Sequence, residues 1–143
     1  MRAPAVHRRA KSRTALEQAT QLFAAVSLFV IGLSHLFQPK AWVVWFQALA
    51  ARGTVGAFTD GFICLSFGAM IVGFHNVWEG PAMVLTLIGW AQVMKALGRF
   101  LAPQVTVHVM QKATMDRAWI FQAGGIFALA LSGFLWWLYF FSV

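Results

Sequence analysis

The chain has 143 residues, of which 60% are hydrophobic and 10% are charged, and its formal net charge is +7. A soluble domain typically carries about 25% charged residues, so this composition excludes an ordinary water-soluble domain. Five of the eleven Lys and Arg residues lie within residues 1–13, which favours contact with anionic lipid over nucleic-acid binding.

Residues 1–13 are basic and lack apolar periodicity, so we predict a disordered tail. Thr14 and Glu17 form a capping-box pattern, which predicts that the first helix begins there. The apolar run that follows has 23 residues and is too long for the core of a cleaved signal peptide, so we expect an uncleaved signal-anchor helix. The Arg-rich, acid-free start also fits a mitochondrial transit peptide, which we keep as an alternative.

Four apolar runs are each long enough to cross a bilayer, because a spanning helix needs about 20 mostly apolar residues. The runs are 15–37, 54–74, 81–101 and 115–141. They predict an all-α membrane protein, a four-transmembrane-helix bundle that forms a single domain over residues 14–143.

A short amphipathic segment separates the first two runs. Trp42, Trp45, Phe46 and Leu49 recur at the spacing of one helix face, while the segment, 39–52, is too short to span. We predict a short interfacial helix with its Trp rings at the level of the lipid headgroups. A re-entrant piece folded against the bundle is the alternative.

The remaining connections are predicted from their turn residues. The tight connection 76–80 predicts an antiparallel hairpin of the second and third spans. Pro81 suits the first turn of the third span, and Pro103 ends that span. We expect a polar loop over 104–113 and a capping role for Thr114 at the start of the fourth span.

Asp60 and Lys95 are charged residues inside predicted spans, where a charge costs roughly 2.5–3.5 kcal/mol unless it finds a partner or water. Each lies about 22 Å from the hairpin turn, counted at about 1.5 Å per residue. We therefore predict an ion pair between them. A static pair that fixes the helix register, a Lys95 side chain that reaches the interface, and a proton, ion or ligand pathway are all compatible with this placement.

Helical periodicity gathers further polar residues on the inward stripes of the four spans, in the half of the bundle near 39–52 and 104–113. The predicted intramembrane polar cluster consists of His35, Asp60, Gln92, Lys95, Arg99 and Gln122. We predict no metal or haem site, because His35 and His75 lie at opposite membrane faces. No catalytic residue or cofactor is indicated by any motif, and Cys64 is interpreted as a packing residue.

Lys and Arg are nearly balanced between the two sides of the predicted bundle. The side of the termini carries five, and the other side carries six when Lys95 and Arg99 are counted with it. Because the first helix usually dominates orientation, we predict both termini in the cytoplasm. The balance also permits insertion in either orientation.

The sequence FHNVW at 74–78, followed by LTLIGW at 85–90, Lys95 and Pro103, resembles a pattern of small uncharacterised bacterial integral membrane proteins of four spans. In that pattern an HNxW turn precedes a TxxGW helix that carries a lysine and ends at a proline. The resemblance covers about thirty residues. It implies a multi-pass location in the bacterial inner membrane, and it implies no activity.

We predict a non-enzymatic membrane subunit or scaffold that works as a homo-oligomer or beside a larger membrane partner. The reason is a short chain with small-residue helix faces and no chemical motif. The alternative is a small transporter or channel that uses the intramembrane Asp60–Lys95 pair, with His35 as a proton relay.

Overall fold

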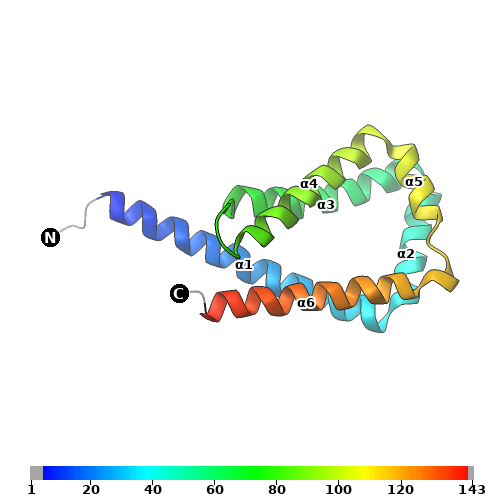
Figure 1. Ribbon diagram of the computed structural model, residues 1–143. Coiled ribbons are helices and arrows are strands. Elements are labelled where there is room, and N and C mark those ends of the chain that lie inside the picture. Colours follow the sequence, from blue (N-terminus) through cyan, green and yellow to red (C-terminus); the bar gives the residue numbers. More distant parts are fainter. Residues whose placement is uncertain (1–4, 142–143) are drawn as a thin grey trace.

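The computed structural model describes the backbone of residues 5–141 and the side chains of residues 15–141. All regular structure in this part of the chain is helical (Figure 1). The helices are α1 (Ala5–Phe37), α2 (Pro39–Ala51), α3 (Thr54–Phe74), α4 (Met83–Leu101), α5 (Pro103–Gln111), the 3-10 helix η1 (Met115–Arg117) and α6 (Trp119–Phe141).

Four segments are long and apolar enough to cross a membrane, namely Ala15–Phe37, Thr54–Phe74, Met83–Leu101 and Met115–Phe141. The prediction of an all-α, four-span membrane protein is therefore confirmed. Large apolar side chains such as Val30, Phe62 and Phe127 are about 60% exposed or more, as expected for surfaces that face lipid chains.

The spans pack as two helix pairs, α1 with α6 and α3 with α4 (Figure 1). Glycines bring the backbones of each pair together. A Cβ atom on Gly125 of α6 would lie 2.8 Å from the carbonyl oxygen of Gly32 on α1, and one on Gly68 of α3 would lie 2.8 Å from the backbone nitrogen of Val93 on α4. Close backbone contact of this kind holds membrane helices together through van der Waals packing.

The two pairs meet at one end of the molecule and diverge toward the other. Where they meet, all four spans contribute to one apolar core, which consists of Ala24, Ala25, Ile71, Leu85, Leu135 and Leu138. Gln21 and Ser132 add hydrogen bonds from their side chains to backbone carbonyls across the α1–α6 contact there, at 2.9 and 2.7 Å. At the divergent end, α2 and α5 pack on each other through Leu49, Ala50 and Met110.

The short helix between the first two spans is confirmed as α2. Its Leu49 is buried and Phe46 packs beside it, whereas Trp45 is 43% exposed. The hairpin of α3 and α4 is also confirmed, although α4 begins at Met83, so Pro81 precedes the helix. Thr114 is extended and precedes η1, but it makes no capping hydrogen bond.

Two local predictions are wrong. Helix α1 begins at Ala5 rather than at Thr14, because a helix already formed over 15–37 extends at little cost into Ala-, Arg- and Lys-containing sequence. The predicted tail is thus helical from Ala5 onward, and residues 1–4 lie outside the described residues. The segment 104–113 is not a loop, since most of it forms α5, which begins with Pro103 in its first turn and buries Met110.

Candidate functional site

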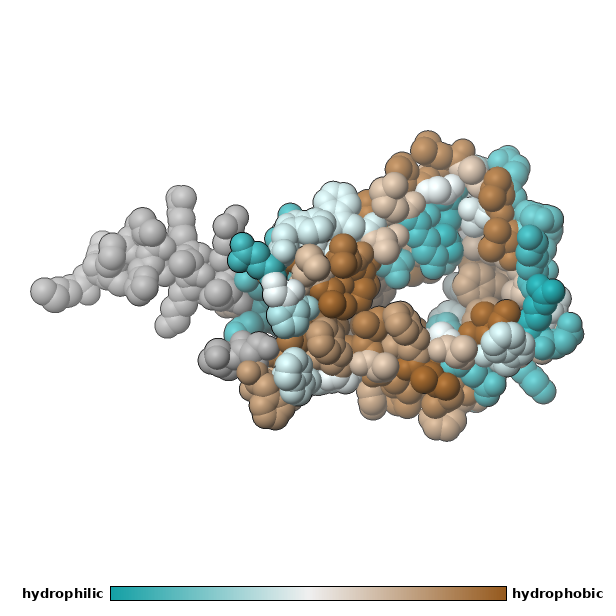
Figure 2. Space-filling view, in the orientation of Figure 1, coloured by the Kyte–Doolittle hydropathy of each residue, from teal (hydrophilic) through white to brown (hydrophobic). Residues whose placement is uncertain are grey.

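A cavity of about 540 Å³ lies where the two helix pairs diverge. Figure 2 shows the molecule hollowed between them, with hydrophilic residues beside the opening. The volume of the cavity is in the range of small-molecule sites, which is roughly 300–1,000 Å³. The cavity is lined by Phe46, Met94, Lys95, Gly98, Arg99, Ala102, Val105, Thr106, Val109, Met110, Lys112, Ala113, Arg117, Ile120 and Phe121.

The lining combines apolar walls with positive charge. Ten of the fifteen residues are apolar or glycine, one is Thr106, and the other four are basic, whereas none is acidic. The four basic residues are Lys95, Arg99, Lys112 and Arg117. Low-dielectric walls strengthen the field of these charges, so the cavity favours an anion.

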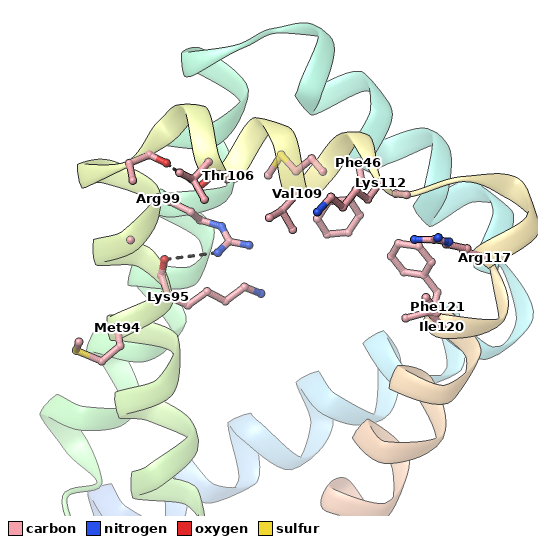
Figure 3. Close-up of a pocket in the computed structure, with 15 residues that line it drawn as sticks. Phe46, Met94, Lys95, Arg99, Thr106, Val109, Lys112, Arg117, Ile120 and Phe121 are labelled. Carbon is pink, nitrogen blue, oxygen red and sulfur yellow. Dashed lines mark hydrogen bonds between the residues drawn. The ribbon is translucent and has the colours of Figure 1, made fainter.

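Helix α4 supplies two of the cations. Lys95 and Arg99 are four residues apart and therefore lie on the same helix face. The Lys95 side chain extends into the cavity (Figure 3). The Arg99 guanidinium donates through Nε to the carboxylate of Asp60 on α3, and its Nη1 lies 3.5 Å from the carbonyl oxygen of Lys95.

The opposite wall supplies the other two cations. Lys112 follows the end of α5, and Arg117 belongs to η1 (Figure 3). The positions of Lys112 and Arg117 depend on α5 and η1, which carry the chain across the divergent end from α4 to α6. Cations from both walls thus surround one shared space.

The predicted Asp60–Lys95 ion pair is wrong, because Asp60 pairs with Arg99. Side chains of a helix tilt toward its N-terminus, and α3 and α4 are antiparallel. The Asp60 side chain therefore tilts away from the hairpin turn, while that of Arg99 tilts toward the turn and meets it. Lys95 lies one helical turn closer to the hairpin, and its side chain tilts away from Asp60. It therefore does not pair with Asp60 and extends into the cavity.

The other three residues of the predicted cluster lie elsewhere. His35 stacks on Trp42 with 3.9 Å between ring centroids, and its Nδ1 donates to the Ile31 carbonyl oxygen at 2.9 Å. Gln92 keeps its side chain away from the cavity and has a buried Oε1 without a hydrogen-bond partner among the described residues. Gln122 is exposed and does not line the cavity.

Lys112 and Arg117 were missed as site residues. The sequence predicts neither as a site residue, because Lys112 falls in the predicted loop 104–113 without a fixed position and Arg117 falls at the start of the fourth span. The available signal was that Lys112 and Arg117 come from the same side of the membrane as Lys95 and Arg99. Six cations on that side, with only Asp60 and Asp116 as acids there, indicate a positive site wherever the chain encloses a space.

The cavity lies close to one surface of the bundle. Lys95 is six residues from the end of α4, which corresponds to about 9 Å along the helix axis, and Arg99 is two residues from it. Arg99, Lys112 and Arg117 therefore lie at about the depth of lipid headgroups on the side of α2 and α5, whereas Lys95 and the apolar residues Met94, Ile120 and Phe121 lie farther toward the middle of the bundle.

Metal ligands do not gather in the part of the chain that the structure describes, since no three His, Cys, Asp or Glu side chains come together there. No protein-family model, curated protein or solved structure matches this chain. The resemblance to bacterial four-span proteins therefore stays a prediction.

Proposed function

We propose that this protein is a non-enzymatic binding subunit of the bacterial inner membrane, and that it holds an anionic molecule in the basic cavity. In this proposal it works as a homo-oligomer or beside a larger membrane partner, with both termini in the cytoplasm. The observation that carries the proposal is the set of four cations around one cavity that has no acidic residue in its lining.

The charge balance of the cavity supports an anion as the ligand. Among the described residues the one ion pair is Asp60 with Arg99, so Lys95, Lys112 and Arg117 have no carboxylate partner within 4 Å. Like charges around a partly apolar space repel one another more strongly than in water. An anion relieves that repulsion and accepts charge-assisted hydrogen bonds from Arg and Lys.

The chemistry of the lining supports binding rather than bond cleavage. It contains no His, Cys, Ser, Asp or Glu, which leaves Thr106 and the two lysines as its reactive side chains. Its single hydroxyl, that of Thr106, donates to the carbonyl oxygen of Ala102 at 3.4 Å.

The test is stabilisation by an anion in nanodiscs of neutral phosphatidylcholine. A ligand that binds the folded state raises the unfolding midpoint with concentration. Inorganic phosphate and pyrophosphate are expected to raise the midpoint of the native protein, and Lys95→Met and Lys112→Met are expected to reduce the effect several-fold. The matched control is Lys40→Met, because Lys40 is exposed outside the cavity. Equal stabilisation of all four proteins would reject the cavity as the anion site.

The subunit assignment has its own test, which is chemical crosslinking in membranes followed by mass analysis. Capture of a second copy or of one larger membrane protein is expected. A chain that stays monomeric in bilayers and captures no neighbour would contradict the subunit assignment and leave the anion site standing.

A second candidate is a small transporter of the same anion. It is favoured by the packing of the spans as two pairs that meet at one end only, since such pairs can rotate against each other about that contact. Here Asp60→Asn is expected to abolish anion flux into proteoliposomes while the fold is retained. Full flux in that variant would reject a transport mechanism that uses the Asp60 pair.

A further inference from the structure

We infer that the anion is the phosphate head of a long-chain amphiphile, and that its hydrocarbon tail lies on the apolar side of the same cavity, between α4 and α6. This inference rests on the proposed anion site and names the class of its ligand.

Polarity changes with depth in the same direction on both walls. On α4, Met94 precedes Lys95 and is the lining residue farthest from the α5 end of that helix. On the opposite wall, Ile120 and Phe121 lie deeper along the fourth span than Arg117 (Figure 3). The deepest lining residues of both walls are thus apolar, and cations lie beside them on the headgroup side together with apolar residues of α2 and α5, so one molecule with a charged head and an apolar tail fits the two regions.

The apolar end of the cavity is open toward lipid. Helix α4 packs mainly on α3 and α5, and α6 packs mainly on α1 and α2, whereas α4 and α6 share only the core at the end where the pairs meet and make no extensive contact beside the cavity. Met94 and Ile120, one on each of these helices, remain 59% and 49% exposed. A hydrocarbon tail can therefore leave the cavity sideways between α4 and α6 without crossing a layer of protein.

Charge favours a phosphate head. A phosphate monoester carries about −1.5 to −2 at neutral pH, which matches the cations without a carboxylate partner better than a single carboxylate does. Free inorganic phosphate would fill only a small part of the 540 Å³ cavity and would leave its apolar residues in contact with water.

The experiment compares ligands that share a head or share a tail, in phosphatidylcholine nanodiscs with unfolding midpoint and native mass spectrometry as readouts. The probes are inorganic phosphate, dodecyl phosphate, dodecanoate and dodecanol, with empty nanodiscs measuring partition into lipid. Dodecyl phosphate is expected to bind at least tenfold more tightly than any of the others.

A variant pair locates the tail. Met94→Gln is expected to weaken dodecyl phosphate binding about tenfold, because it places an amide where the tail contacts the wall, and to weaken stabilisation by inorganic phosphate far less. Leu97→Gln is the matched control, since Leu97 is an exposed residue of α4 that does not line the cavity.

The outcomes separate the inference from the proposed function. If inorganic phosphate stabilises as strongly as dodecyl phosphate, or Met94→Gln has no effect, the tail assignment is overturned and the anion site stands. Dodecanoate as tight as dodecyl phosphate overturns the phosphate head. Binding of dodecanol as tight as that of dodecyl phosphate, or no binding by any probe, overturns the proposed function together with the inference.

Discussion

The guanidinium of Arg99 is held by the carboxylate of Asp60 across the α3–α4 contact, one helical turn beyond Lys95. The side chains of Arg99 and Asp60 are 14% and 10% exposed. Removing two charges from water is costly, and their mutual attraction offsets that cost only when the pair stays intact. Asp60 therefore neutralises one of the four cavity cations and leaves Lys95 as the uncompensated charge on that wall.

Asp60→Asn is expected to strengthen anion binding, because it frees the charge of Arg99 for the cavity. We expect a gain of several-fold in affinity for dodecyl phosphate, measured by titration in nanodiscs, together with a loss of stability of about 1–3 kcal/mol. Glu79→Gln removes an acid from the distant α3–α4 connection and is the control. Weaker binding in Asp60→Asn, at unchanged fold, would show that Asp60 serves the site in another way.

Gly125→Ala is expected to destabilise the protein by about 1–3 kcal/mol, because the added Cβ atom would lie within 2.9 Å of backbone atoms of Gly32 and Leu36 and would force α1 and α6 apart. The neighbouring Gly124 has no atom within 4 Å of such a Cβ atom, so Gly124→Ala is expected to be nearly neutral. Thermal unfolding in nanodiscs measures both. Equal midpoints for the two variants would contradict a tight α1–α6 contact.

Thr86→Val is expected to loosen the α3–α4 connection. The Thr86 hydroxyl donates to the Val77 carbonyl oxygen at 2.7 Å and accepts from the Val77 amide at 3.0 Å. Valine leaves both backbone groups without this partner, at a cost of about 1–3 kcal/mol. The rate of amide hydrogen exchange of residues 75–82 should rise in Thr86→Val. Thr59→Val is the control, since the Thr59 hydroxyl donates within its own helix. Unchanged exchange in Thr86→Val would argue against this role.

The stability of the protein is expected to decrease as the pH decreases, because of His75. This residue follows the end of α3 and is 2% exposed. Burial lowers the pKa of His75 below its ordinary value of 6.5. The folded protein then holds the imidazole neutral at pH values where the unfolded chain binds a proton. The free energy of unfolding is therefore highest above about pH 6.5 and decreases progressively below it.

The measurement for His75 is the unfolding midpoint between pH 5 and 8, compared with His75→Gln, which cannot titrate. The native protein should lose stability toward the acid end of this range more steeply than the variant. Parallel curves would mean that His75 is protonated to the same degree in the folded and unfolded states.

The spans and α2 could be predicted from the sequence because they depend on local quantities. Length and hydropathy define a span, and the spacing of Phe46 and Leu49 defines a helix face regardless of distant contacts. The sequence does not predict helix α5, because Val105, Thr106 and Val107 are β-branched and disfavour a helix locally. Packing of Met110 against α2 stabilises the helix in the folded protein.

The site was predictable only in part. Periodicity brought Asp60, Lys95 and Arg99 to one region, since they share the facing stripes of α3 and α4. Which cation Asp60 binds depends on side-chain tilt across the hairpin, which a count of residues from the turn ignores. The cavity itself depends on how far the two helix pairs diverge, and no local pattern encodes that angle.

The HNxW and TxxGW residues have a structural explanation. The Thr86 hydroxyl accepts a hydrogen bond from the Val77 amide, and the Trp90 indole Nε1 donates to the Asn76 side chain at 3.5 Å. Gly89 allows Ile71 to approach, since a Cβ atom there would lie 2.6 Å from it. The HNxW and TxxGW motifs thus close one helix hairpin at the end of α4 away from the cavity, whereas the lysine of the pattern, Lys95, lines the cavity.

Because the helix pairs join at one end and part at the other, the cavity lies in a single leaflet of the bilayer. The direction in which the chain inserts would decide whether inner-leaflet or outer-leaflet molecules reach Lys95. With Lys and Arg spread almost evenly over the two sides, a mixed population of insertions would let one gene product sample both monolayers.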